Sequence, residues 1–340
     1  MCEHLFVRWD NLTIENERDA TLPGFKEPAV VRTFDAPEAL GTRFYEVRAR
    51  SAINEVPKRS RMPFRYTINP YRGCSHACAY CFARPTHTYL DFNAREDFER
   101  EIVVKVNVPE LLRVELARPS WKGDHVALGT NTDPYQWVEG RYRLLRGIWE
   151  AMRDFANPCS VLTKSPLLLR DLDLMKEIAE RTDFTANLSI PTLDEKAWRD
   201  TEPHTPHPRK RIDAVAELKR AGIRTGVLVA PLIPGVNDAP EKVEPLLELL
   251  DEAGPDSIGG VALHLRGEVR DIWFDWLQLH RPDLIPMYEE LYQRGAYARS
   301  EIRNRHAELA KFQRARPRRG LRAAPKSSST KGGDPQAALF

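Results

Sequence analysis

The sequence predicts an α/β protein whose centre is a partial (β/α)6 barrel of six parallel strands. Three observations support this fold class. Short runs rich in apolar and β-branched residues recur along the chain, apolar residues at helical spacing fill most of the segments between them, and polar or glycine-rich segments follow several of the runs. The expected strands are residues 64–69, 125–128, 160–164, 184–190, 225–230 and 258–264.

The segments between the expected strands carry helix signals. Asn107 followed by Pro109 predicts a helix start, because asparagine caps helices and proline suits the first turn. Residues 141–155 place large apolar side chains on one face, which indicates a helix packed against the core. Gly222 is the expected end of another helix. Further helices are expected at 85–90, 109–117, 172–179, 212–221 and 243–250, and a further β-like run at 102–106.

The 340-residue chain is expected to have four parts. Residues 1–60 combine prolines and charges with little periodicity, and they form an N-terminal extension that wraps the core. Residues 61–270 hold the barrel, residues 271–312 form a C-terminal helical extension, and residues 313–340 form a disordered basic tail. The 51 Lys and Arg residues nearly balance the 49 Asp and Glu residues, so the total charge identifies no partner.

Three of the five cysteines form the most informative motif in the chain. Cys74, Cys78 and Cys81 are spaced C-x3-C-x2-C directly after the first expected strand. Thiolates are the preferred ligands of soft iron and of iron–sulfur clusters, and a short loop brings all three to one site. Three ligands leave one iron of a four-iron cluster without a cysteine, and that iron is open to a substrate.

Other uses of these thiols are a structural zinc site, a disulfide with a spare thiol, or a chance cluster. Zinc normally takes a fourth protein ligand, and His76 and Cys159 are the candidates. A disulfide is disfavoured because the N-terminus lacks the basic and hydrophobic regions of a secretory signal.

A second polar cluster, residues 129–136, follows the second expected strand. In barrel enzymes the loops after the strands build the active site, so Thr132 and Asp133 are candidate ligand-binding residues. Gly129 allows close approach of the backbone. A helix N-cap at Asp133 before Pro134 explains part of the same string.

The cysteine motif resembles the signature of the radical S-adenosylmethionine (SAM) superfamily. Four segments in order resemble its spore-photoproduct-lyase-like branch, often called DNA repair photolyase-like. These segments are residues 69–84, 129–136, 202–211 and 230–238.

The resemblance implies two cofactors, a [4Fe-4S] cluster and SAM. It implies that the reduced cluster cleaves SAM reductively, and that the resulting 5′-deoxyadenosyl radical abstracts a hydrogen from a substrate. Carried over by position, the three cysteines are the cluster ligands. The other implied binding residues are Tyr80 near the adenine, Thr132 and Asp133 near the amino acid end of SAM, Ser189 near the ribose or carboxylate, and Gly235 and Val236 near the adenine.

The expected protein is therefore a lyase-like radical SAM enzyme that acts on a DNA or nucleotide lesion. Spore photoproduct lyases have a tyrosine directly after the last cluster cysteine and a hydrogen-donating cysteine near the end of the second strand. This chain has Phe82 and Thr130-Asn131 there, and neither set is a practical hydrogen donor. Reversal of a thymine dimer by the known route is therefore not predicted. The alternatives are radical modification of a peptide or small metabolite, and a non-catalytic iron–sulfur redox protein associated with DNA.

The partners expected from the sequence are an electron donor such as flavodoxin or ferredoxin, a DNA substrate and a sliding clamp. The clamp is suggested by the basic tail, whose end resembles a clamp-binding peptide through Gln336, Leu339 and Phe340. Its arginines could also contact phosphate. No apolar run approaches the roughly 18 residues that span a bilayer, so the expected location is cytoplasmic, without membrane contact.

Overall fold

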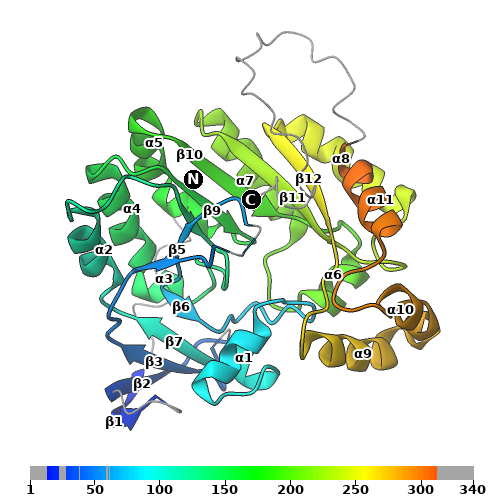
Figure 1. Ribbon diagram of the computed structural model, residues 1–340, viewed down its shortest axis with the longest axis horizontal. Coiled ribbons are helices and arrows are strands. Elements are labelled where there is room, and N and C mark those ends of the chain that lie inside the picture. Colours follow the sequence, from blue (N-terminus) through cyan, green and yellow to red (C-terminus); the bar gives the residue numbers. More distant parts are fainter. Residues whose placement is uncertain (1–13, 23–27, 38, 59, 61, 312–340) are drawn as a thin grey trace.

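Two β-sheets organise the computed structural model, which describes residues 14–22, 28–37, 39–58, 60 and 62–311 (Figure 1). The larger sheet curves through the middle of the molecule, and the smaller one lies beside it near the N-terminal segments. The predicted tail with Gln336, Leu339 and Phe340 lies outside the described residues, and so does Cys2.

The larger sheet contains the predicted six parallel strands. Its strand order is β12-β11-β10-β9-β8-β5-β4, so the six strands that follow one another along the chain also lie side by side. All neighbouring pairs from β5 to β12 are parallel, and β4 alone is antiparallel, on the edge next to β5. The bounds are β4 Ile53–Glu55, β5 Tyr66–Ile68, β8 Val126–Leu128, β9 Cys159–Thr163, β10 Phe184–Ser189, β11 Thr225–Leu232 and β12 Ser257–Ala262. The predicted partial barrel is confirmed.

Helices connect these strands and cover the outer face of the sheet (Figure 1). Their apolar faces bury Trp149, Ile148, Ile178, Val215 and Leu250 completely against the sheet, which forms the main core of the molecule. The connecting helices are α2 Val108–Leu116, α3 Glu139–Tyr142, α4 Leu144–Asp154, η2 Pro166–Asp171, α5 Leu172–Arg181, α6 Glu195–Thr201, α7 Pro208–Arg220 and α8 Pro240–Ala253.

The smaller sheet differs from the extended N-terminal lead-in expected from the sequence. Its order is β1-β2-β3-β7-β6, with bounds β1 Ile14–Thr21, β2 Pro28–Phe34, β3 Arg43–Val47, β6 Tyr71–Arg72 and β7 Glu101–Lys105. β3 pairs in parallel with β7, and the Arg43 guanidinium bonds the Glu101 carboxylate at 2.9 Å across this pair. Because β6 ends directly before Gly73, this sheet fixes the start of the cysteine loop.

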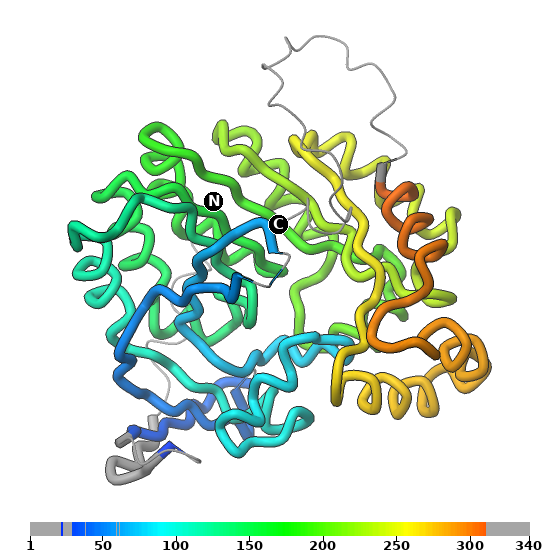
Figure 2. Tube along the Cα trace, in the orientation of Figure 1, coloured from blue at the N-terminus to red at the C-terminus, as the bar shows by residue number. Residues whose placement is uncertain are grey.

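C-terminal helices close the other side of the molecule. They are α9 Val269–His280, η3 Pro282–Leu284, α10 Ile285–Leu291 and α11 Ser300–Lys311. α11 packs on the edge strand β12 so closely that a Cβ atom on Gly260 would lie 2.4 Å from the carbonyl oxygen of His306. The cyan segment that carries the cysteines runs between the smaller sheet and these helices (Figure 2), and it continues into η1 Arg84–Leu90 and α1 Glu96–Arg100. Among the described residues, no helix is both long and apolar enough to cross a membrane.

Candidate functional site

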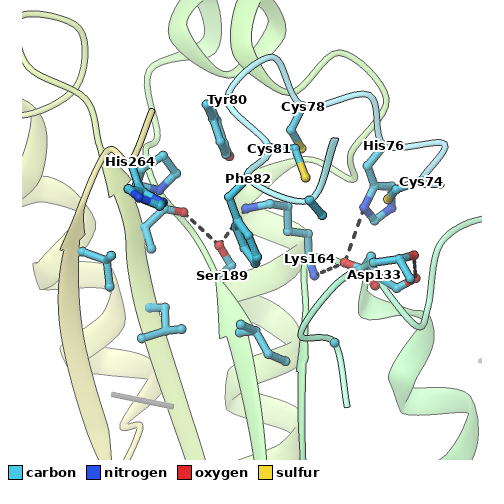
Figure 3. A pocket seen from close by; sticks show the side chains of 18 of the residues that line it. Cys74, His76, Cys78, Tyr80, Cys81, Phe82, Asp133, Lys164, Ser189 and His264 are labelled. Carbon is cyan, nitrogen blue, oxygen red and sulfur yellow. Dashed lines mark hydrogen bonds and ion pairs between the residues drawn. The ribbon is translucent and has the colours of Figure 1, made fainter. Parts of the chain in front are cut away.

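A cavity of about 200 Å³ lies where the carboxyl ends of the parallel strands meet the cysteine loop. The loop residues Cys74, Cys78 and Cys81 form one wall, and residues at the ends of β8 to β12 form the others. The side chains in Figure 3 converge from these separate elements on one space. This is the position at which barrel enzymes place their active sites.

All three clustered cysteines are free thiols. Cys74 and Cys78 are buried and Cys81 is partly buried. Removal from water raises the pKa of Cys81 to about 11 and that of Cys78 well above 9.0. Thiols held in such surroundings become ligands when a metal supplies the positive charge that stabilises the thiolate. The donor set therefore fits an iron–sulfur cluster.

The position of Cys159 argues against a structural zinc site. Cys159 lies at the amino end of β9, paired in register with Val126 and Phe184, and therefore at the opposite end of the strands from the cavity. It cannot complete a site with the three loop cysteines. Across the described parts of the chain, no three His, Cys, Asp or Glu side chains are placed to share a single metal ion. A four-iron cluster does not require such a group, because each thiolate binds a different iron.

The loop after β8 is bonded directly to the start of the cysteine loop. Thr132 Oγ1 donates to the carbonyl oxygen of Gly73 at 3.0 Å, and Gln136 Nε2 donates to the same oxygen at 3.2 Å. The backbone N–H of Ser75 donates to Gln136 Oε1 at 3.0 Å. These bonds fix the two loops to each other, so Thr132 has a structural role in addition to lining the cavity.

Asp133 links this loop to the end of β9. It accepts bonds from Thr163 Oγ1 at 2.6 Å and from the backbone N–H of Lys164 at 2.7 Å, and its Oδ2 lies 3.4 Å from His76 Nδ1. Burial opposes ionisation of Asp133, but His76 and these hydrogen bonds lower its pKa. Burial likewise opposes protonation of His76, whereas Asp133 and Cys74 raise its pKa to about 9. Asp133 and His76 thus form a close pair beside the first cysteine.

Gly129 is needed where β8 turns into this loop. Its φ of +84° lies in the left-handed region, and a Cβ atom there would lie 1.9 Å from the carbonyl oxygen of Leu162. We expect Gly129→Ala to destabilise the protein by about 2–5 kcal/mol, because it adds this clash to the backbone strain.

Gly222→Ala is the matched control for Gly129→Ala. Gly222 has nearly the same φ, +81°, but nothing lies within 4 Å of its added Cβ atom. It should therefore show the backbone strain alone, about 1–2 kcal/mol. Denaturant unfolding of the two metal-free variants measures the difference, and equal losses would show that the approach of Gly129 to Leu162 is unimportant.

A buried polar network fills the wall between the cysteine loop and β10. The Glu202 carboxylate accepts a hydrogen bond from the Tyr80 hydroxyl, and it pairs with Lys164 Nζ at 2.9 Å and with Arg211 Nη2 at 2.6 Å. The side chains of Glu202 and Arg211 are fully buried. Lys164 also donates to Ser189 Oγ at 2.7 Å (Figure 3). Two cations thus share one carboxylate, which leaves positive charge in the cavity wall.

The sequence did not identify Lys164, Glu202 and Arg211 as site residues. Lys164 directly follows β9 at the catalytic edge of the sheet, and that position alone was a usable signal. The other two lie in the 202–211 connection, which the resemblance singled out without giving it a role. Their role in the buried polar network is evident only in the structure, which places them next to Ser189 and Tyr80.

Gly235 and Val236 lie further from the cavity than the other predicted binding residues. They are in the turn after β11 and are not among its lining residues. The backbone N–H of Gly235 donates to Asp238 Oδ1 at 2.7 Å, and Val236 packs in the apolar cluster that includes Cys78 and Tyr80. In this structure they support the wall from behind.

Aromatic rings complete the cavity. Phe82 is 54% exposed and points into it (Figure 3). His264, which follows β12, lies in the opposite wall, and its ring stacks on Tyr297 with centroids 4.3 Å apart. The sequence had indicated Phe82 only as a departure from a family pattern, and His264 only as the last residue of an expected strand.

The chain is similar to known proteins in sequence and in fold. A model of the radical SAM superfamily matches residues 68–259. An uncharacterised protein of Mycobacterium tuberculosis is 46% identical over 302 residues, which cover 87% of this chain and 89% of the relative. Spore photoproduct lyase complexed with dinucleoside spore photoproduct superposes with a TM-score of 0.57 at 17% identity, covering 79% of this chain and 78% of the lyase. A variant of that lyase with bound AdoMet and dinucleoside spore photoproduct gives a TM-score of 0.55 at 16% identity, with 78% and 77% covered.

Proposed function

Because the chain belongs to the radical SAM superfamily, we propose that Cys74, Cys78 and Cys81 hold a [4Fe-4S] cluster and that SAM binds in the adjoining cavity. The observation that carries this proposal is the placement of three free thiols in the wall of a cavity at the carboxyl ends of six parallel strands. The family implies both cofactors. When bound, the cluster supplies the electron for reductive cleavage of SAM, the reaction general to the family.

The residues of the cavity suit the polar groups of SAM. Lys164 brings a positive charge that complements the carboxylate, and Ser189 lies within hydrogen-bond distance of the same ammonium. Asp133 and Thr132 line the same cavity and are the residues proposed for the amino group. The Tyr80 ring, with Lys164 Nζ 5.6 Å from its centroid, forms part of the wall proposed for the adenine. Gly235 and Val236 would support that wall from the turn after β11.

The proposed substrate is a DNA or nucleotide lesion. Spore photoproduct lyase shares the fold and, in its solved structure, holds a dinucleoside spore photoproduct. The cavity walls add exposed aromatic surface at Phe82, on which a planar base can stack. With Phe82, Thr130 and Asn131 in the donor positions, the hydrogen-transfer route of that lyase is not part of the proposal.

Product analysis of the reconstituted enzyme tests this function. The protein is loaded anaerobically with iron and sulfide, reduced, and given SAM with either damaged or undamaged duplex DNA. We expect 5′-deoxyadenosine to form several-fold faster with damaged DNA, together with a changed nucleotide.

Each contrary result points to another function. Equal turnover with and without DNA would favour a peptide or small metabolite. A reducible cluster that never cleaves SAM would favour a redox protein. Members of this superfamily need an electron donor, and flavodoxin and ferredoxin are the candidates proposed here. The sliding-clamp prediction lies outside the described residues and stays a prediction.

A further inference from the structure

The Arg84 side chain is buried directly beneath the cysteine loop. It lies three residues after Cys81, at the start of η1, and its side chain is only 3% exposed. A guanidinium group has five N–H donors and no acceptor, and burying it is costly unless those donors are satisfied. The hydrogen-bond partners of Arg84 therefore show which parts of the structure this buried side chain holds together.

All five N–H donors of Arg84 have hydrogen-bond partners. Two of these partners are carbonyl groups of the cysteine loop. Nε donates to the carbonyl oxygen of Cys78 at 3.0 Å, and Nη2 donates to that of Ala77 at 3.1 Å. Nη1 donates to the carbonyl oxygens of Ala94 and Arg95 at 3.1 and 3.0 Å, and Nη2 also bonds the Glu99 carboxylate. The guanidinium thus joins the cysteine loop to the segment before α1.

The loop needs such a restraint because its backbone is strained. Ala77 has a φ of +55°, in the left-handed region that costs a residue with a Cβ atom about 1–2 kcal/mol. Only a few backbone bonds close the loop, including Ala77 N–H to Cys74 O and Cys81 N–H to Cys78 O, both 3.2 Å. Arg84 bonds the carbonyl of the strained residue itself and that of the next cysteine.

We propose that Arg84 is a positioning residue that shapes the cysteine loop for the cluster before the cluster binds. This inference rests on the proposed function, since it concerns the same three thiols. Lysine cannot replace arginine here, because a single ammonium cannot bond the carbonyl groups of the loop and those of the segment before α1 at the same time.

Two measurements on Arg84→Lys test the proposal. In the metal-free protein, we expect amide hydrogen exchange across residues 74–84 to become faster by on the order of tenfold, with other segments little changed. In the loaded protein, we expect iron to pass to a chelator on the order of tenfold faster. Glu99→Gln, which removes one charged anchor and leaves four carbonyl partners, should give a smaller change in the same direction.

Arg170→Lys is the matched control. The Arg170 side chain is also largely removed from solvent, at 9% exposed, but it bonds Glu139 and Asp171 and no residue of the cysteine loop. It should lower the melting temperature and leave iron release unchanged. If Arg84→Lys does not fold, Glu99→Gln decides the question.

Unchanged loop exchange and iron release in the folded Arg84 or Glu99 variant would overturn the proposal, and so would equal iron release in Arg84→Lys and Arg170→Lys. Failure of the unmodified chain to bind a cluster would instead count against the proposed function, because the exchange measurement needs no metal.

Discussion

Replacing Cys78 with serine is expected to remove the iron–sulfur cluster and reduce SAM cleavage to background, a loss of more than about 100-fold. Serine keeps the size of the side chain but offers a harder oxygen that stays protonated, and such a group does not hold a soft iron. Iron and sulfide content per chain and the yield of 5′-deoxyadenosine measure the two effects. Cys74→Ser and Cys81→Ser should behave in the same way.

Cys159→Ser is the control for this prediction. Cys159 is more buried than the cluster cysteines, at 1% exposed against 6% for Cys74 and Cys78, and it lies at the amino end of β9, away from the cavity. Burying a hydroxyl there should cost some stability, while the iron content stays at the level of the unmodified protein. A cluster that survives in Cys78→Ser, or that is lost in Cys159→Ser, would contradict the assignment of ligands.

The barrel could be predicted because its signals are local. β9 and β10 each form from a short run in which every second residue is apolar or small and buried, and each run is visible without knowing its neighbours. The predicted strands 160–164 and 184–190 differ from β9 and β10 by only a residue at their ends. The first strand was predicted as 64–69, and only Tyr66–Ile68 pairs regularly.

The smaller sheet could not be predicted in full in this way because the pairing of β3 with β7 is not local. β3 and β7 are joined in parallel across 58 residues of sequence, from Arg43 to Glu101. Nothing near residue 43 indicates that its partner lies after the cysteine loop. The prolines and charges of residues 1–60 suggested an irregular extension, whereas residues 28–34 and 43–47 form strands.

The site likewise combines a local pattern, which could be predicted, with contacts between distant residues, which could not. The cysteines share one loop, so their spacing alone predicted a metal centre. The bond between Tyr80 and Glu202 joins residues 122 positions apart, and the sequence gives no sign that they meet. Arg84 was visible only as the end of the cysteine string, because its role depends on the fold of the loop around it.

Removing the Glu202 carboxylate is expected to cause a large loss of stability. Glu202→Ala would leave the fully buried Arg211 guanidinium without its counter-ion and would free Tyr80 and Lys164. Breaking one side of a buried ion pair typically costs about 3–5 kcal/mol. Guanidinium unfolding of the metal-free protein measures this loss. We also expect weaker SAM binding, because Lys164 loses the group that holds it in the cavity wall.

The contribution of the Glu202 carboxylate to the stability of the protein should decrease as the pH falls. Burial alone would raise the pKa of Glu202, but Arg211 and Lys164 lower it well below the unfolded value of 4.5. A carboxyl whose folded pKa is depressed stabilises the protein fully above its unfolded pKa, and this contribution is lost as the pH falls towards the folded pKa. The stability difference between the unmodified protein and Glu202→Gln should therefore be constant between about pH 6 and 8 and shrink below about pH 4.5.

Glu195→Ala is the control for Glu202→Ala, because it removes an exposed ion pair instead of a buried one. Glu195 pairs with Arg199 and His207, but its side chain is 54% exposed, and exposed ion pairs contribute little to stability. Its variant should melt close to the unmodified protein and bind SAM equally well. If Glu202→Ala were no less stable than Glu195→Ala, the Glu202 carboxylate would not be what holds Arg211, Tyr80 and Lys164 together. The positive charge at Lys164 would then need another anchor, and the proposed place for the SAM carboxylate would lose its main support.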